Sequence, residues 1–162
     1  MNQTSSRSIG GGCGLRIYPP LLAAGLLIAT LILHLLGGPH HYPHRVQVHE
    51  FIGLLTAVVG AWFSAFAAGV FTGRNTTLNP YGEPAQLVDA APFTFTRNPM
   101  YAGVATLLLG FALFFWSPVM LLAPIIFFLV IDRAVIPREE QNLERIFGAA
   151  YQDYQRRVRR WL

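Results

Sequence analysis

One stretch decides the fold: Thr96-Arg97-Asn98-Pro99-Met100-Tyr101-Ala102-Gly103, which stands where a long polar segment meets a long apolar run. Asn98 is a favoured helix N-cap and Pro99 suits the first helical position, so we expect a helix to begin here. The free N–H groups and positive dipole end of that helix would lie beside the guanidinium of Arg97, with Tyr101 one turn later on the same side. This arrangement predicts a site that holds a small zwitterion by its carboxylate. The alternative is a plain helix start beside a topogenic arginine.

The composition indicates a membrane protein. Of the 162 residues, 53% are hydrophobic and only 12% are charged, about half the charged share of soluble proteins. The net charge of +4 comes largely from four arginines near the C-terminus: Arg156, Arg157, Arg159 and Arg160. Beside apolar segments, such a cluster suits anionic lipid headgroups, and we expect no nucleic-acid binding. Cys13 is the single cysteine, so an intrachain disulfide is excluded.

Four apolar segments have the length that crosses a bilayer, which is about 20 residues in a helix. We predict transmembrane helices over residues 17–36, 51–71, 99–115 and 119–135. The last two are separated only by Trp116-Ser117-Pro118 and are expected to form a hairpin with Trp116 at the far interface. The fold class that follows is an all-α integral membrane bundle. Residues 1–16 are polar, rich in Gly and Ser and predicted to be disordered, whereas 17–162 form one domain.

The arginine-rich segments gather on one side of this topology. They include the loop 72–98 and the C-terminal segment 137–162, and the positive-inside rule places this side and both termini in the cytoplasm. Pro137 is predicted to start an amphipathic helix at the membrane surface, with Glu139 and Glu140 in its first turn and a break near Gly148.

Sequence patterns of other site classes are missing. The connection after the first span carries four histidines, His40, His41, His44 and His49, but their order on a Pro/Gly loop fixes no ligand geometry and we expect no metal site. The chain has no GxSxG elbow, no HExxH pair, no P-loop and no Rossmann glycine pattern.

Two blocks of sequence resemble a known family. The first contains Leu87-Val88 followed by Phe93-Thr94-Phe95-Thr96-Arg97-Asn98-Pro99-Met100-Tyr101-Ala102-Gly103. The second contains Glu139-Glu140, Leu143, Phe147-Gly148, Tyr151, Tyr154 and Arg159-Arg160-Trp161. Their order and spacing are similar to the signature of the isoprenylcysteine carboxyl methyltransferase and phospholipid methyltransferase superfamily, in particular its small bacterial members. The chain departs at Asn98, where many members have histidine, and at Ala91, where glycine is usual.

The resemblance implies an integral membrane enzyme that uses S-adenosylmethionine, in the bacterial inner membrane with a cytoplasmic active site. The implied cofactor-binding residues are Leu87, Val88, Arg97, Asn98, Pro99, Tyr101, Gly103, Glu139, Glu140, Tyr151 and Tyr154, and Arg97 and Glu140 are the implied catalytic pair. For Tyr151 and Tyr154, packing of an amphipathic helix is an equal alternative.

Several acceptors remain open. Methyl transfer from a sulfonium needs no acid and no metal, only alignment and exclusion of water. A lipophilic carboxylate such as an isoprenylcysteine-like group, or a thiolate, needs no base, and Arg97 or Arg133 would orient it. A phospholipid amine must be deprotonated, and Glu140 is then the expected base. A non-catalytic membrane scaffold is the alternative outside enzymes. The sequence indicates no oligomeric state.

Overall fold

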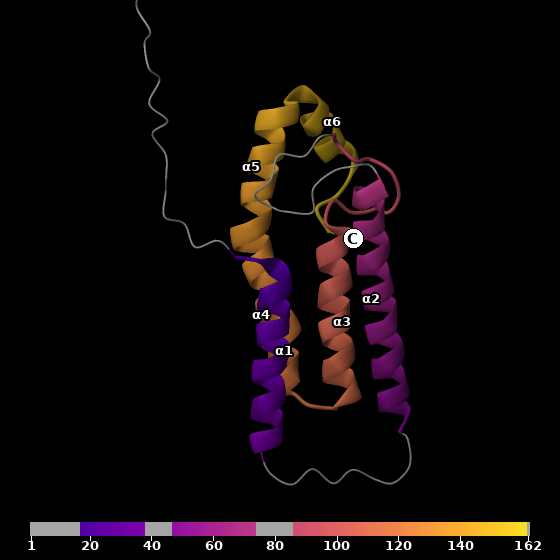
Figure 1. The fold of residues 1–162 in the computed structure, drawn as a ribbon, viewed down its shortest axis with the longest axis vertical. Coiled ribbons are helices and arrows are strands. Elements are labelled where there is room, and N and C mark those ends of the chain that lie inside the picture. Colours follow the sequence, from indigo (N-terminus) through magenta and orange to yellow (C-terminus); the bar gives the residue numbers. More distant parts are fainter. Residues whose placement is uncertain (1–16, 38–46, 74–85, 162) are drawn as a thin grey trace, which may run out of the picture.

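The computed structural model describes residues 17–37, 47–73 and 86–161, and the secondary structure within these ranges is entirely helical. Helices α1 to α4 form a bundle, and α5 and α6 lie at one end of it (Figure 1). The elements are α1 Pro19–Leu36, α2 Val48–Gly73, α3 Pro99–Phe114, the 3₁₀ turn η1 Val119–Leu121, α4 Leu122–Val130, the π-helical segment η2 Ile131–Val135, α5 Ile136–Phe147 and α6 Ala149–Arg157. The prediction of an all-α bundle is confirmed.

The described helices have the apolar character of membrane spans. Helix α1, helix α2 and the continuous run Val119–Phe147 are each long and apolar enough to cross a membrane, and α3 is a shorter apolar helix. Large apolar side chains face outward along them, as Phe51, Leu55 and Trp62 do on α2, which is the expected surface where lipid is the solvent. These helices are consistent with an integral membrane protein. Residues 1–16 and most of the histidine-rich connection lie outside the described residues.

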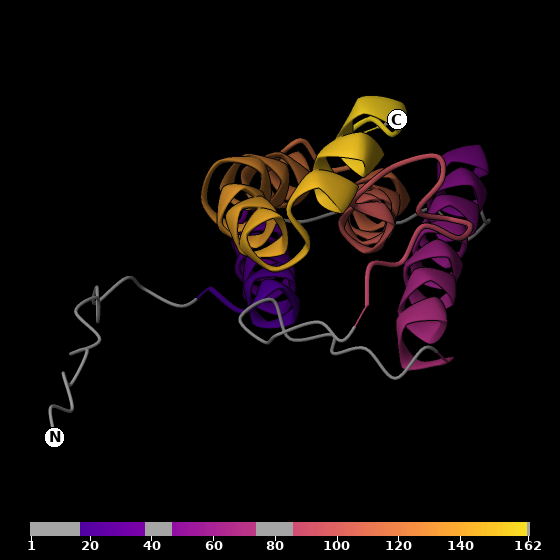
Figure 2. The same ribbon diagram turned by 90° about the horizontal axis from the view of Figure 1, so that it is seen from above.

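Helix α3 is central. Helix α2 packs along one side of it, and α4 lies on the other side (Figure 2). Helix α1 packs against α4. Helix α1 begins at Pro19, where the Pro19-Pro20 pair predicts a helix start, and α2 is longer than the predicted span at both ends.

Glycines let α2 and α3 approach until their backbones touch. A Cβ built at Gly60 of α2 would lie 2.4 Å from the backbone nitrogen of Leu107 and 2.6 Å from the carbonyl oxygen of Gly103. Gly53 of α2 and Gly110 of α3 are equally crowded by backbone atoms. Small residues at an interface give helices in lipid their packing energy, so this contact fixes α3 firmly against α2.

A tight turn joins α3 to α4, as predicted for Trp116-Ser117-Pro118. Trp116 has a φ of 46°, and its side chain is exposed at the end of the bundle away from α5 and α6. The same end carries a contact between the rings of His34 and Phe115, whose centroids are 5.5 Å apart. The predicted hairpin is confirmed.

The helix that we expected to stop before Pro137 does not stop. It continues from α4 through η2 into α5, with Pro137 in the first turn of α5. Proline has no N–H and clashes with the preceding turn, and a π-helical segment accommodates both effects by widening the helix locally. Asp132 and Arg133 lie in this widened segment.

Beyond the bundle, α5 and α6 pack with the segment before α3. The predicted break is confirmed at Gly148, which separates the two helices with a φ of 51°. Residues 86–98 form turns that are held in place by buried Val88 and Phe93. Ala91 precedes Pro92 through a cis peptide bond and has no positive φ.

Candidate active site

The segment Val158–Trp161, here named the C-terminal strap, crosses the start of α3. Three hydrogen bonds attach it there: the Arg97 N–H donates to the Arg159 carbonyl (2.9 Å), the Thr96 hydroxyl donates to the Arg160 carbonyl (3.0 Å), and the Asn98 side-chain amide donates to the same carbonyl (3.0 Å). Thr96 is fully buried and Asn98 nearly so. The last residues of the chain are therefore built into the stretch that decides the fold.

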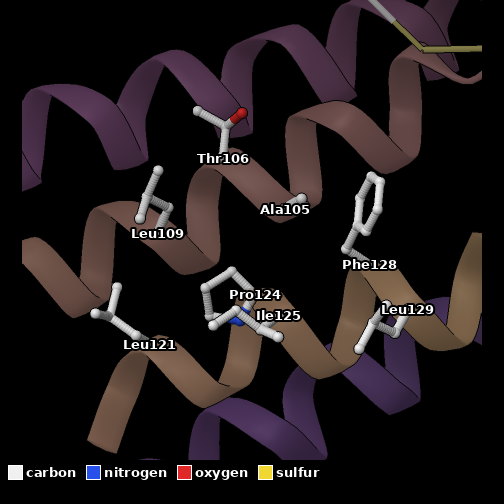
Figure 3. A pocket seen from close by; sticks show the side chains of 8 residues that line it. All are labelled: Ala105, Thr106, Leu109, Leu121, Pro124, Ile125, Phe128 and Leu129. Carbon is white, nitrogen blue, oxygen red and sulfur yellow. The ribbon is translucent and has the colours of Figure 1, made fainter. Parts of the chain in front are cut away.

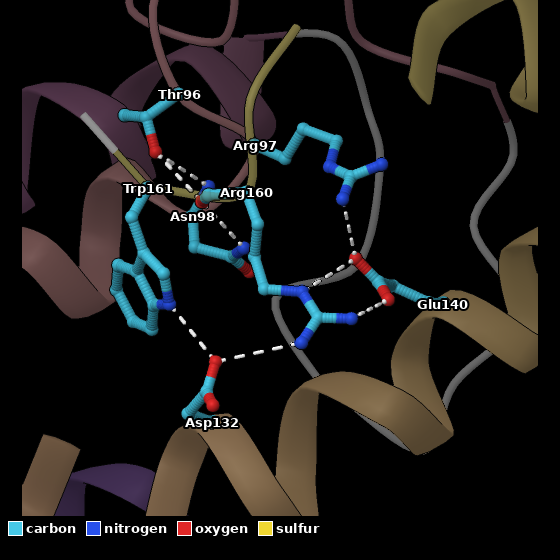
Figure 4. A network of polar contacts seen from close by, with 7 residues as sticks. All are labelled: Thr96, Arg97, Asn98, Asp132, Glu140, Arg160 and Trp161. Atoms are coloured by element: carbon cyan, nitrogen blue, oxygen red, sulfur yellow. Dashed lines mark hydrogen bonds and ion pairs between the residues drawn. The ribbon is translucent and has the colours of Figure 1, made fainter. Parts of the chain in front are cut away.

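Four charged side chains meet between the strap, α3 and the η2–α5 segment (Figure 4). Arg97 Nη2 lies 3.0 Å from Glu140 Oε1, and Arg160 Nη2 lies 2.6 Å from Glu140 Oε2. Arg160 Nη1 also reaches Asp132 Oδ1 at 3.5 Å, and the Trp161 indole N–H donates to the same oxygen at 2.9 Å. Two cations thus face two carboxylates in a largely buried place.

Glu139 stands apart from this network. The Tyr101 hydroxyl donates to Glu139 Oε1 at 2.6 Å, which links α3 to α5 beyond the apolar part of the Val119–Phe147 run. Burial is the main cause that raises the pKa of Glu139 from 4.5 to about 7, and the neighbouring Glu140 adds to it, while the Tyr101 hydrogen bond opposes it. The two consecutive glutamates therefore differ: Glu140 pairs with two arginines, and Glu139 has a pKa close to neutral.

One nitrogen of the Arg97 guanidinium makes no hydrogen bond among the described residues. Its side chain is only 13% exposed, and its Nε is a buried nitrogen without a hydrogen-bond partner among the described residues. A buried unsatisfied donor is costly and calls for an explanation such as a ligand. The guanidinium is directed by Glu140 from one side, so the remaining donor can serve an anionic group.

Four of the implied cofactor residues pack against other apolar groups. Val88 is buried with Phe93, and Leu87 packs on the cluster that contains Tyr151 and Tyr154. The Tyr154 hydroxyl donates to the carbonyl of Phe93 at 2.8 Å. Burial raises the pKa of Tyr151 to about 12 and that of Tyr154 further, so both phenols stay protonated. In the structure these side chains hold α6 over the segment before α3.

The helix start is as predicted at Pro99, but Asn98 acts differently. Its carbonyl accepts from the Ala102 N–H at 3.0 Å, whereas its side chain makes no cap bond and turns to the strap. The Asn98 side chain hydrogen-bonds the Arg160 carbonyl and does not cap the helix. A buried carbonyl that loses a hydrogen bond is costly, which favours this arrangement. Gly103 lies in the close contact with Gly60 of α2, which is a packing position.

An apolar groove lies between α3 and α4 (Figure 3). It offers about 370 Å³ and is lined by Ala105, Thr106, Leu109, Leu121, Pro124, Ile125, Phe128 and Leu129. Its one polar side chain is already satisfied, because the Thr106 hydroxyl donates to the Ala102 carbonyl at 2.8 Å. One end is close to the polar cluster: the rings of Phe128 and Trp161 are in tilted contact, with centroids 4.7 Å apart.

Sequence reasoning missed Asp132, Arg160 and Trp161 as site residues. Arg133, which we considered for acceptor binding, has an 80% exposed side chain, whereas its neighbour Asp132 points into the network. One signal was available: Arg160 and Trp161 end the second sequence block, and Asp132 is a carboxylate at the end of an apolar helix.

Apolar helices long enough to cross a membrane, with a charged cluster gathered at one end of the bundle, are consistent with an integral membrane protein. A model described as "Phospholipid methyltransferase" matches residues 48–150. This is more than half of the chain, and the chain belongs to this family of membrane methyltransferases. An uncharacterised protein of Haemophilus influenzae (strain ATCC 51907 / DSM 11121 / KW20 / Rd) is 43% identical over 63 residues, which cover 39% of this chain and all of that protein. No solved structure matches the chain.

Proposed function

We propose that the protein transfers a methyl group from S-adenosylmethionine to a lipophilic acceptor at the membrane surface. The single observation that carries the proposal is the cluster of Arg97, Glu139 and Glu140 at one end of the bundle, in a chain of a methyltransferase family. That end also holds the arginines of α5 and α6, which supports a cytoplasmic position in a bacterial inner membrane.

The residues present fit the proposed cofactor. Its amino-acid part carries a carboxylate and an ammonium group. The buried Nε of Arg97 is an unused donor of the right charge for the carboxylate. Glu139 is a carboxyl group without a cationic partner in the charge network and suits the ammonium group or the ribose hydroxyls. Glu140 would act indirectly, because both of its oxygens are engaged by arginines.

When bound, S-adenosylmethionine supplies an electrophilic methyl group whose donor leaves as a neutral thioether. The protein therefore needs to align the acceptor and keep water out. Arg97 would hold the cofactor by its charge, and Tyr101 would fix the carboxyl group of Glu139 by its hydrogen bond. Tyr151 and Tyr154, packed above the start of α3, would keep this end closed to water.

The groove between α3 and α4 supports a lipophilic acceptor. Its volume falls within the range of ligand pockets, and its walls offer hydrocarbon and no free hydrogen-bonding group. A hydrocarbon chain in the groove would end near Phe128 and Trp161, next to the polar cluster. An isoprenylcysteine-like carboxylate, presented in this way, needs no base.

Glu139 favours a second acceptor class, a phospholipid amine. An ammonium group must lose a proton before it can attack, and a base with a pKa of about 7 is suited to accept it at neutral pH. We predicted Glu140 for this task, but both of its carboxylate oxygens are engaged by arginines. Glu139 therefore takes the role of base in this alternative.

The test is binding of S-adenosylmethionine and S-adenosylhomocysteine to the detergent-purified protein by calorimetry. We expect micromolar binding that is lost in Arg97→Ala, whereas Arg157→Gln, on the exposed side of α6, should bind like the wild type. No binding to the folded wild type would favour the scaffold alternative. With binding shown, a radiolabelled methyl donor and lipid extracts identify the acceptor: an ester product is labile to mild base, and an N-methyl or S-methyl product is not.

A further inference from the structure

We propose that Arg160 is a positioning residue: acting through Glu140, it sets the side chain of Arg97 for the carboxylate of the cofactor. The inference rests on the proposed function and gives a role to Arg160, which the resemblance places in the second sequence block without assigning it to the cofactor-binding or catalytic residues. Arg160 lies on the C-terminal strap, which bridges the start of α3 and the η2–α5 segment.

The geometry at Glu140 supports this role. Arg160 approaches both carboxylate oxygens, with Nη2 at 2.6 Å from Oε2 and Nε at 3.3 Å from Oε1. Such a two-point contact fixes the plane of a carboxylate as well as its position. Arg97 makes its ion pair with Oε1, so the direction of its guanidinium depends on a carboxylate that Arg160 holds.

Arg160 is itself held from three sides. Its carbonyl accepts from Thr96 and Asn98, its Nη1 reaches Asp132, and the next residue, Trp161, donates to the same Asp132 oxygen. The partners of Arg160 lie in the segment before α3, in η2 and in α5, and the Glu140 hydrogen bond raises the pKa of Arg160. The guanidinium of Arg160 is therefore held in one position between Asp132 and Glu140.

Arg160 also affects ligand binding through the balance of charges at the site. With Arg160, the cations Arg97 and Arg160 match the anions Asp132 and Glu140. Without it, two carboxylates face one buried cation, and the extra negative charge repels an anionic ligand group near Arg97. Loss of Arg160 should therefore weaken ligands that carry a carboxylate more than ligands that lack it.

Two probes separate positioning from a general structural role. S-adenosylhomocysteine carries the amino-acid carboxylate, and 5′-methylthioadenosine is an adenosyl thioether without it. We expect Arg160→Gln to weaken S-adenosylhomocysteine about tenfold and 5′-methylthioadenosine less than about twofold, with an unchanged melting temperature in detergent. Arg160→Lys should recover most of the affinity, because an ammonium group can still lie between Asp132 and Glu140. Arg159→Gln, whose exposed side chain is next in the strap, is the matched control and should bind like the wild type.

Equal weakening of both probes by Arg160→Gln, or no weakening at all, would overturn the inference. Should that variant fail to fold, Arg160→Met carries the same test, since it removes the charge and keeps an unbranched apolar stem of similar length; a selective loss for S-adenosylhomocysteine supports the role and a uniform loss refutes it. A folded wild type that binds neither probe would overturn the proposed function and this inference with it.

Discussion

Substitution of Gly60 by alanine should destabilise the bundle, because the new methyl group has no room. The nearest atoms to a Cβ at this position are backbone atoms of α3: the Leu107 nitrogen at 2.4 Å, the Gly103 oxygen at 2.6 Å and the Thr106 carbonyl carbon at 2.9 Å. Backbone atoms cannot rotate away as a side chain can. The two helices must separate by roughly 1 Å to restore ordinary contact distances, which loses the packing along their length.

The matched control is Gly69→Ala on the same helix. No atom lies within 4 Å of a Cβ built at Gly69. Both variants gain about the same helix propensity, which favours alanine over glycine by about 1 kcal/mol. The difference between them therefore isolates the cost of overpacking, and we expect Gly60→Ala to be less stable than Gly69→Ala by about 1–3 kcal/mol.

Thermal unfolding in dodecyl maltoside, followed by circular dichroism at 222 nm, gives the comparison. Under the proposed function, binding of S-adenosylhomocysteine should also weaken in Gly60→Ala, because the candidate site lies at the start of α3. Two variants with the same melting temperature would show that α2 and α3 are not packed backbone to backbone, and the reasoning would be refuted.

Two further predictions concern α5 and its end. Because the pKa of Glu139 is raised from 4.5 to about 7, the folded protein holds this proton at pH values where the unfolded chain has lost it. Its contribution to stability therefore falls as the pH rises from about 4.5 to about 7, by at most about 3 kcal/mol; Glu139→Gln should lack this fall, and identical pH profiles of unfolding would contradict the assignment. Gly148→Ala should cost about 1–2 kcal/mol, because the φ of 51° is unfavourable for alanine although no atom crowds the site; a melting temperature equal to that of Gly69→Ala would speak against a strained turn.

The sequence predicted the helices well because their signals are local. Apolar runs of bilayer length, the Asn98-Pro99 start and the Trp116-Ser117-Pro118 turn each depend on a few neighbouring residues. The missing stop before Pro137 has a different cause. Proline is a strong local signal for a helix boundary, but the π-helical segment accommodates the proline ring and its missing N–H without ending the helix. Whether such a segment forms depends on the packing of the whole run.

The candidate site could be predicted only in part, because the contacts between its residues depend on the whole fold. Arg97 and the two glutamates stand out in the sequence, but their pairing does not, because Glu139 and Glu140 are adjacent and only the fold gives them different partners. Arg160 looked like one of four similar arginines in a basic tail. Its separate role depends on a strap that returns to residues more than sixty positions earlier, a contact that no local pattern predicts.

The glycine contact between α2 and α3 has a mechanical consequence. Two helices whose backbones touch at successive turns cannot slide or tilt past one another without a steric clash, so they behave as a single stiff body. The junction between α3 and α4 is built differently, with side chains around an open apolar groove. Under the proposed function, this groove is therefore the place where a lipid in the plane of the membrane would enter between the helices.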